Sequence, residues 1–484
     1  MALDIVIMAA GKGTRMKSRH PKVLHRLAGQ PLLAHVLAAT AMLDEHHTWV
    51  ITGHGADEVE SAIAGSGALC VRQMPQLGTG HAILQVVPHL AGGGVTGAGA
   101  GAEAGPETGA GAMDGTTLIL NGDVPLIDAG TARALAEACG GQHLALLTIV
   151  LDDASGYGRI LRAGDAMDGR VLGIVEHKDA TPAQREIREV YTGMMAAPTA
   201  ALKRWVAALK NDNAQGEYYL TDIVAMAVAE GTAVVATQAA DETEVLGVNS
   251  PLQLADLERR FQRRQADALL EAGVRLADPA RFDLRGSLSA GQDVEIDVGC
   301  VFEGVVALGD DVRIGAHCVI RDTTIAAGTV VYPFSHIEGA TVGAGAVIGP
   351  FARLRPGAEL GEDVHIGNFV EVKNSTLARG AKANHLAYLG DATVGERVNF
   401  GAGSITANYD GAHKHRTVIG ADVHIGSNCV LIAPVSIGEG GTVGGGSTIG
   451  KDTPAGQLTV ARGKQVSIAG WKRPVKAVKP VQPV

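Results

Sequence analysis

Short apolar runs alternate with segments of helical period over the first 230 residues. Pro31–Leu43 has the period of a helix, and alternation of this kind is typical of an α/β domain, a βαβ sheet with helices on both faces. Ligands of such sheets lie at the carboxyl ends of the strands. Segments 9–16 and 121–123 each follow an apolar run, so we expect both at that rim. The runs that predict buried strands are IVIM (5–8), WVIT (49–52), TLILNGD (117–123) and LALLTIV (144–150).

A single amphipathic helix is predicted over residues 250–273. Ser250 suits the N-cap, Pro251 the first turn and Gly273 the end, and charged residues fill the polar face. We interpret it as a linker helix that follows an N-terminal domain, residues 1–249. A nucleic-acid-binding helix is the weaker alternative, because four acidic residues dilute its charge. The apolar positions are Leu254, Leu257, Phe261, Ala268 and Leu269, and the acidic ones are Asp256, Glu258, Asp267 and Glu271.

Aliphatic residues recur at every sixth position in the second half of the chain. Six-residue repeats build a parallel β-helix, in which the aliphatic side chain points inward and glycine supplies the corners. We assign 274–450 to this domain and 451–484 to a tail. The pattern breaks at 378–393 and 403–417, which we interpret as loops that carry function. The ladders are Ile419, Ile425, Leu431, Ile437, Val443, Ile449, then Val342, Ile348, Leu354, Leu360, Ile366, Val372, and the shorter Leu308, Ile314.

Composition separates two glycine-rich regions. Glycine supplies 65 of 484 residues, nearly twice the average share of about 7%. Within 286–450 glycine fits the corners of the β-helix. Residues 91–115 hold mostly glycine and alanine, with nothing large enough to anchor a core, so we predict a disordered surface insertion there.

Charge, cysteine content and hydropathy narrow the class of protein. The formal net charge of −10 argues against a nucleic-acid-binding surface. The five cysteines are odd in number and lack the C-x-x-C spacing, which indicates buried free thiols rather than a disulfide framework or a zinc ribbon. The sequence begins without a signal-peptide pattern, and no apolar run reaches the roughly 18 residues of a membrane helix. We expect a cytoplasmic protein without a membrane span.

The segment AAGKGTRMKS (9–18) resembles two phosphate-binding motifs and matches neither. Met16 stands where G-x-G-x-x-G needs its third glycine, and the Walker A spacing is absent. Backbone N–H groups of a glycine turn at a helix N-terminus, together with Arg15, can still cradle phosphates. A plain glycine-rich turn is the alternative for the glycines alone.

Further motifs identify a family. AAGKGTRM, PKVLH, QLGTGHA, NGDVPL, GYGRI and GIVEHKDA occur in the order found in sugar-1-phosphate nucleotidyltransferases, and NAQGEYYLTD, DPARFDLRG, GPFARLRPGAEL, GNFVEVKN and HLAYLGD follow. The chain resembles the bacterial bifunctional N-acetylglucosamine-1-phosphate uridyltransferases and glucosamine-1-phosphate acetyltransferases over nearly its whole length except 91–115. The resemblance implies a Rossmann-like nucleotidyltransferase domain, a left-handed β-helix, and a homotrimer with active sites between neighbouring subunits.

The resemblance implies uridylyl transfer in the first domain, from UTP to N-acetylglucosamine-1-phosphate. Arg15 and Lys22 would clamp phosphates as catalytic residues, and Asp123 and Asn249 would hold Mg²⁺, a hard ion suited to oxygen ligands. Tyr191 stands where the family often has Asn before Thr-Gly, and Asn121 where some members have Tyr before Gly-Asp. Gln73, Gly78 and Thr79 match uracil-reading positions, Gly158 and Glu176 match sugar contacts, and the other implied substrate positions are Met8, Ala9, Ala10, Gly11, Asn121, Gly122, Tyr191 and Asn249.

The second implied activity is acetyl transfer from acetyl-CoA to glucosamine-1-phosphate. An ammonium group must lose a proton before it attacks a thioester, and a histidine base suits this task. His385, in HLAYLGD within the first break of the ladder, matches the family's base. The basic tail 471–484 is interpreted as attracting coenzyme A phosphates, with a solvated terminus as the alternative. Arg355 and Lys373 match sugar-phosphate positions, Tyr388 and Asn399 further substrate positions, and Ala402, Asn408, Tyr409, Ser427, Gly445 and Arg462 acetyl-CoA positions.

Two alternative functions stay open at this point. The β-helix could serve only for oligomerisation beside a single-activity sugar-1-phosphate nucleotidyltransferase. A zinc hydratase on the same β-helix could recruit His365, His385 and His424, although solenoid histidines are more often exposed than metal-bound.

Overall fold

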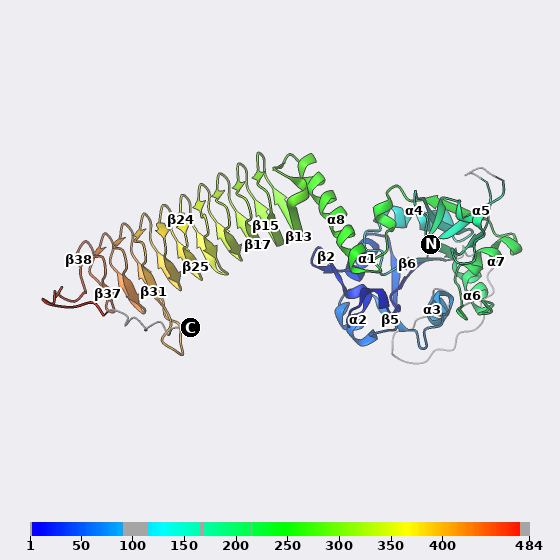
Figure 1. Ribbon diagram of the computed structural model, residues 1–484, viewed down its shortest axis with the longest axis horizontal. Coiled ribbons are helices and arrows are strands. Elements are labelled where there is room, and N and C mark those ends of the chain that lie inside the picture. The colour runs from blue at the N-terminus through cyan, green and yellow to red at the C-terminus, as the bar shows by residue number, and fades with distance from the viewer. Residues whose placement is uncertain (1, 91–114, 165–168, 214, 475–484) are drawn as a thin grey trace, which may run out of the picture. The chain divides into compact units, whose positions relative to one another are not determined.

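The computed structural model describes residues 2–90, 115–164, 169–213 and 215–474 (Figure 1). It divides into two compact units, Met1–Gln265 and Ala266–Val484. The insertion predicted at 91–115 lies outside the described residues except for Gly115, and the tail is described only as far as residue 474. No helix among the described residues is long and apolar enough to cross a membrane.

The first unit is built on one mainly parallel sheet. Its nine described strands run in the order β11-β7-β10-β6-β1-β4-β5, with β8 and β9 attached beside β10. Strand β10 is antiparallel to both β6 and β7, a reversal that the apolar runs did not indicate. The four predicted strands are confirmed. The bounds are β1 (Leu3–Met8), β4 (His46–Thr52), β5 (Leu69–Arg72), β6 (Thr116–Asn121), β7 (Leu144–Val150), β8 (Gly158–Arg162), β9 (Val171–Val175), β10 (Glu189–Pro198) and β11 (Val234–Gln238).

Helices cover both faces of this sheet, as predicted. Alternate residues of β1 face opposite sides, so that Ile5 and Ile7 lie in one hydrophobic core and Val6 in the other. The first core takes side chains from α1 (Leu32–Thr40), which confirms the helix predicted at Pro31–Leu43, and from α2 and α4. The second takes them from α3, α6 and α7. These helices span α2 (Ala56–Ala62), α3 (Thr79–Val86), α4 (Ala129–Cys139), α6 (Thr199–Ala207) and α7 (Asp222–Glu230), and α5 (Pro182–Arg185) is a single turn.

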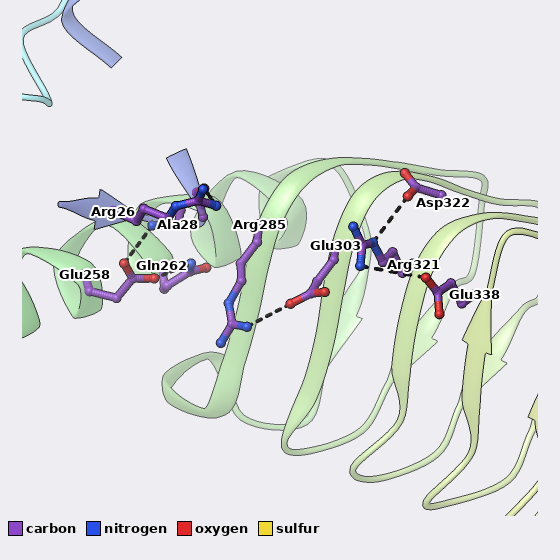
Figure 2. A network of polar contacts seen from close by, with 10 residues as sticks. Arg26, Ala28, Glu258, Gln262, Arg285, Glu303, Arg321, Asp322 and Glu338 are labelled. Carbon is purple, nitrogen blue, oxygen red and sulfur yellow. Dashed lines mark hydrogen bonds and ion pairs between the residues drawn. The ribbon is translucent and has the colours of Figure 1, made fainter. Parts of the chain in front are cut away.

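Helix α8 (Pro251–Glu271) contributes to both units. It begins at the predicted cap, where Ser250 Oγ accepts the Gln253 N–H at 3.3 Å. Its Leu257 is buried with the core of the first unit, and Ala266 and Leu269 belong to the core of the second. The Glu258 carboxylate accepts the backbone N–H of Ala28 at 2.7 Å, which fixes the hairpin of β2 (Arg26–Leu27) and β3 (Gln30–Pro31) against α8 (Figure 2).

The second unit is a parallel β-helix of hexapeptide repeats, with three faces of short strands. Three long strands, β13 (Phe282–Ala290), β15 (Cys300–Leu308) and β17 (Val319–Ile325), begin the two faces that share one sheet. The first of these faces continues through β19 (His336–Glu338), β22 (Arg353–Leu354), β25 (Glu371–Lys373), β28 (Tyr388–Gly390), β31 (Ile405–Ala407), β34 (Val430–Ile432) and β37 (Thr448–Ile449). The second continues through β20 (Ala340–Val342), β23 (Ala358–Leu360), β26 (Ser375–Leu377), β29 (Ala392–Val394), β32 (Thr417–Ile419) and β35 (Val435–Ile437). The separate sheet is β12 (Arg275–Leu276), β14 (Glu295–Ile296), β16 (Arg313–Ile314), β18 (Val330–Val331), β21 (Val347–Ile348), β24 (His365–Asn368), β27 (Lys382–His385), β30 (Asn399–Phe400), β33 (His424–Ile425), β36 (Thr442–Val443) and β38 (Leu458–Thr459).

Every predicted ladder residue is buried in the core of the β-helix. All five cysteines are free, as predicted, and four are buried. The prediction of a buried thiol is wrong for Cys70, which is exposed because β5 lies at the edge of its sheet.

The two breaks in the ladder have different structures. Residues 378–393 do not form a loop, so this prediction is wrong. The inward positions continue through Leu377, Ala383, Leu389 and Val394, and Val372 pairs with Leu389 in the next coil. The coil from Val372 to Leu389 has 17 residues instead of the 18 of three hexapeptides. The missing residue shifts the six-residue pattern of aliphatic positions, although the chain stays within the coil. The second break does contain a loop, because the chain leaves the coil after Ala407 and rejoins it at Thr417.

Candidate active sites

The glycine-rich turn after β1 brings Lys22 toward the rim of the sheet. Gly13 adopts φ +57°, and a Cβ there would stand 2.6 Å from Lys22 Cβ. Glycine at this position therefore permits both the left-handed turn and the close passage of Lys22. Arg15 belongs to the following 3₁₀ turn (Thr14–Met16) and is exposed.

Lys22, Asp123 and Asn249 converge from separate parts of the chain. The Lys22 ammonium contacts a carboxylate oxygen of Asp123 and donates to Asn249 Oδ1 at 3.0 Å. Asp123 follows β6, and its carbonyl accepts the N–H of Val248 at 2.9 Å, which brings the segment before α8 to the rim.

The two oxygens meet at a single positive charge, and a carboxylate with an amide oxygen is a donor set that suits Mg²⁺. No group of three or more His, Cys, Asp or Glu residues that could hold a metal occurs in the described part of the chain. Asp123 and Asn249 would therefore share the ion with water or phosphate oxygens.

Two cavities lie beside this cluster and share Met8, Thr79, Asn121 and Glu217. The one next to Lys22 measures about 400 Å³, and the one next to Glu176 about 470 Å³. Together they bring most of the implied nucleotidyltransferase residues into one region. The smaller is also lined by Ala10, Gly11, Gln73, Gly78 and Asp123, and the larger by Gly158, Glu176 and Tyr191.

The implied uracil-reading residues form one bonded unit. Gln73 is buried, and its side-chain amide donates to the Gly78 carbonyl at 2.9 Å. The Tyr218 backbone spans this turn, donating to the Leu77 carbonyl and accepting from Gly80 N–H, both at 2.8 Å. Thr79 Oγ1 accepts the N–H of Leu220 at 3.0 Å. We call residues 215–221 the strap, because they hold the turn at the start of α3.

The larger cavity has a polar wall. Burial raises the pKa of Glu176, although one of its oxygens accepts the Thr221 hydroxyl at 3.3 Å. Burial, and then the charge of Glu176, also raise the pKa of Tyr191, so the phenol stays neutral. A Cβ at Gly193 would stand 2.5 Å from Asn121 Nδ2, so glycine makes room for the Asn121 amide.

Some implied residues do not line these cavities, and other residues do. Ala9 and Gly122 act through the backbone: Ala9 N–H donates to Ile51 at 2.9 Å and Gly122 N–H to Met8 at 3.0 Å. Sequence reasoning did not single out a number of the lining residues, and four of these bring polar groups or space to the cavities from within or beside a motif that it had found. They are Lys12, Gln76, Gly193 and Glu217.

In the second unit His385 lies at the end of β27, within the coil rather than in the predicted loop. The side chain is exposed, and its Nδ1 lies 3.0 Å from Asn368 Oδ1 on the neighbouring strand. An amide oxygen can only accept, so Nδ1 is the donor in this contact and Nε2 is the ring nitrogen left for another partner. His365, His385 and His424 are not brought together as a metal-binding group.

A group of cations surrounds Lys373, at the end of β25. Arg355 pairs with Glu371 at 2.8 Å, and Lys414 of the loop after β31 lowers the pKa of Lys373, with a further contribution from Arg355. Asp391 accepts hydrogen bonds from Asn374 and Asn408, which outweigh burial and hold its pKa below the usual value. Sequence reasoning missed Lys414, because it lies outside every repeat.

Charged residues of alternating sign lead along this face of the β-helix toward these cations. Arg285, Glu303, Arg321 and Glu338 are paired in register on successive coils (Figure 2), and the Arg285–Glu303 pair measures 2.8 Å. Leu354 pairs with Val372 on the next coil, so the residues that follow them, Arg355 and Lys373, are neighbours. The alternation of positive and negative charge ends at these two successive cations. Two cations on neighbouring coils suit the binding of a phosphate, and Arg355 would bind it while paired with Glu371.

The implied acetyl-CoA residues stack on successive coils. Ala402 accepts the N–H of Asn428, Ser427 accepts that of Gly446, and Gly445 accepts a hydrogen bond from Arg462, each at 2.8 Å. The remaining ones lie apart from this stack. Asn399 is in β30 and Tyr388 in β28, the Asn408 amide holds Asp391, and Tyr409 is exposed with its hydroxyl donating to Gly411.

Family comparisons match both units. Residues 5–275 match the MobA-like NTP transferase domain, 284–366 the GMPPB C-terminal domain, and 416–451 six bacterial transferase hexapeptide repeats. "Bifunctional protein GlmU" of Methylibium petroleiphilum is 72% identical, covering 98% of this chain and 99% of that protein. The proteins of the same name from Paracidovorax citrulli (99% of both chains) and Azoarcus sp. (98% of this chain, 100% of the relative) are 64% and 57% identical.

The chain belongs to the GlmU family. It is a bifunctional transferase with a nucleotidyltransferase domain and a hexapeptide-repeat acetyltransferase domain, which confirms the predicted fold class and enzyme class. Each of these three relatives is named bifunctional, which favours two activities over the single-activity alternative.

Proposed function

We propose that the second unit acetylates glucosamine-1-phosphate with acetyl-CoA, and that the first unit then transfers a uridylyl group from UTP to N-acetylglucosamine-1-phosphate. In the second reaction a phosphate oxygen of the sugar forms a bond to the α-phosphorus, and the bond to the β-phosphate breaks to release pyrophosphate. The observation that carries the proposal for uridylyl transfer is the convergence of Lys22, Asp123 and Asn249 beside two cavities that share four lining residues.

Positioning and charge neutralisation supply most of the help that uridylyl transfer needs. The smaller cavity would take UTP, with Lys22 and the exposed Arg15 binding its phosphates and the bonded unit of Gln73, Gly78 and Thr79 holding the base. The larger cavity would take the sugar. When bound by Asp123 and Asn249, Mg²⁺ would neutralise phosphate charge.

Acetyl transfer would depend on His385 as general base. Its Nε2 lone pair takes the proton as the amine nitrogen attacks the thioester carbonyl, and the coenzyme A thiolate leaves. A positioned base of this kind contributes about 10²–10⁴-fold. Asn368 fixes the ring through Nδ1. Arg355 and Lys373 would bind the sugar phosphate, and the stack from Ala402 to Arg462 would bind acetyl-CoA.

We also propose that the chain forms a homotrimer, as the resemblance implies. Support comes from an exposed column of stacked rings, His317, Phe334, Phe351 and Phe369, with ring centroids 5.3, 5.1 and 5.4 Å apart. Leu386, which follows His385, is 61% exposed. Exposed apolar side chains of this extent are typical of an interface. The trimer predicts three times the chain mass in sedimentation equilibrium, and a monomer would contradict it. The cytoplasm stays the expected compartment.

Paired substitutions test the two activities. His385→Ala is expected to abolish acetyl transfer and keep uridylyl transfer, whereas Asp123→Ala is expected to do the reverse. His424→Ala, an exposed histidine on the same face of the β-helix, is the matched control and should keep both. Loss of both activities in either folded variant would show that the sites are not independent and would contradict the proposal.

A further inference from the structure

The loop of residues 408–416 takes the place of a single corner residue of the β-helix. On the two coils before it, Asn374 alone joins β25 to β26 and Asp391 alone joins β28 to β29. Both have positive φ angles, +45° and +51°, and so does Gly339, which joins β19 to β20 at the same corner. On the next coil Asn408 follows β31 at this corner, but the chain runs outward before β32 begins. The loop is therefore an insertion at one corner.

Asp391 holds both ends of this loop. It is 6% exposed, and its two carboxylate oxygens each accept one amide, from Asn374 and from Asn408 at the start of the loop. Its backbone carbonyl accepts the N–H of Thr417, where the chain rejoins the coil, at 3.1 Å. The Thr417 hydroxyl is buried without a partner among the described residues, so it adds nothing to this attachment. Because both carboxylate oxygens are occupied within the protein, Asp391 acts on the loop rather than on a substrate.

The loop is also bonded within itself. The Asp410 carboxylate accepts two backbone N–H groups of the loop, at 2.7 and 2.8 Å, and lies 2.7 Å from Nε2 of His415. Tyr409 forms an antiparallel bridge with Lys414. A segment tied together in this way takes its position from its two ends, and hence from Asp391.

The loop brings Lys414 to the cations of the acetyl-transfer site, where it lies close enough to Lys373 to lower the pKa of that ammonium group. Two ammonium groups this close repel each other, so the loop must be held in place from elsewhere. We propose that Asp391 is a positioning residue of acetyl transfer, which fixes the start of the 408–416 loop and so places Lys414 beside Lys373 for the phosphate of glucosamine-1-phosphate. The inference rests on the proposed acetyl transfer and deepens it, because Asp391 acts through Lys414 without touching a substrate.

Asp391→Gly provides the first test, because it removes the carboxylate and keeps a residue that suits the corner, as Gly339 does. The backbone carbonyl still holds Thr417, so only the start of the loop is released. We expect the KM for glucosamine-1-phosphate to rise about tenfold, since a hydrogen bond to a charged group is lost, while kcat changes by less than about threefold. Asn374→Gly is the matched control at the same corner. It removes only the amide on the other carboxylate oxygen, and both constants should stay within about twofold of native.

A merely structural role would divide the effect differently between the two constants. If Asp391 only stabilised the β-helix, Asp391→Gly would lower the melting temperature of the second unit and the kcat, through loss of active chains, and the KM would stay native. That result would overturn the proposal. Asp391→Asn keeps the shape of the side chain and should give an intermediate KM, because neutral hydrogen bonds are about half as strong as charged ones. If the glycine variant did not fold, a native KM in Asp391→Asn would overturn the proposal instead.

A double-mutant cycle tests the route through Lys414. Lys414→Ala removes the ammonium group and should itself raise the KM for glucosamine-1-phosphate. Asp391→Gly added to it should change that KM by less than about twofold, because the group that Asp391 positions is then absent. A full tenfold effect of Asp391→Gly in the Lys414→Ala chain would overturn this route. If the native chain transferred no acetyl group to glucosamine-1-phosphate, the proposed function would be wrong, whereas an active native chain with a native-like Asp391→Gly variant would refute only the role of Asp391.

Discussion

Gly78→Ala should open the nucleotide end of the first unit without unfolding it. Gly78 precedes α3 with φ +103° and ψ 175°, a region that only glycine occupies readily. A Cβ there would stand 2.7 Å from the Tyr218 carbonyl oxygen and 2.9 Å from its nitrogen. Both are backbone atoms of the strap, so neither can rotate away as a flexible side chain would.

The magnitude follows from these two effects. The backbone conformation alone costs a non-glycine residue about 1–3 kcal/mol, and the strap must also move. A total near 3 kcal/mol would reduce the population of the closed turn by about 100-fold. The hydrogen bonds of Tyr218 with Leu77 and Gly80 would break together, and the Gly78 carbonyl would no longer hold Gln73.

Steady-state kinetics of pyrophosphate release would measure the effect, with acetyl transfer by the same sample as the internal standard. We expect the KM for UTP to rise at least about 30-fold, which corresponds to about 2 kcal/mol. Gly216→Ala is the matched control, because Gly216 also has a positive φ, +65°, in the strap, but nothing lies within 4 Å of its added Cβ. If the two variants had equal KM values for UTP, the argument from the Tyr218 contact would be refuted.

Two further predictions concern charge and assembly. Glu176→Gln should raise the melting temperature of the first unit at pH 7, because burial raises the pKa of Glu176 and its ionisation therefore lowers stability. The gain should vanish as the pH falls through about 4.5, where the carboxyl of the unfolded chain protonates. An equal gain at pH 4 and pH 7 in calorimetry would contradict this. Phe351→Ser should reduce the sedimenting mass and acetyl transfer, while uridylyl transfer continues. Val305→Ser is the control, at an apolar residue that is 70% exposed outside the column of rings, and it should change neither the mass nor acetyl transfer. A Phe351→Ser variant that sediments like native would contradict an interface at this column.

Periodicity predicted most of the fold, because each ladder residue must be buried. Ile366 and Leu431 could be placed inward from spacing alone, and both are buried. The coil around His385 could not be predicted in this way, because a shift of one residue in the spacing looks like a break in the repeat when only the sequence is known. The reversal of β10 was likewise missed, because an apolar run carries no sign of direction.

The candidate sites were predictable as lists of residues but not as contacts. Lys22, Asp123 and Asn249 are distant in sequence, and only the fold shows that the lysine spans the two oxygens. Lys414 had no pattern to identify it, because its position depends on where the loop after Ala407 returns.

Helix α8 sets a condition on any attempt to produce the two halves of the enzyme separately. Leu257 covers Leu27, Leu32 and Val248 in the first unit, while Ala266 and Leu269 are buried in the second. A gene split just before Pro251 would deprive the first polypeptide of its apolar cover and favour aggregation. A split near residue 265 would leave each polypeptide the turns of the helix that its own core requires. Two separately produced, soluble halves would therefore need a division within helix α8 rather than in a loop.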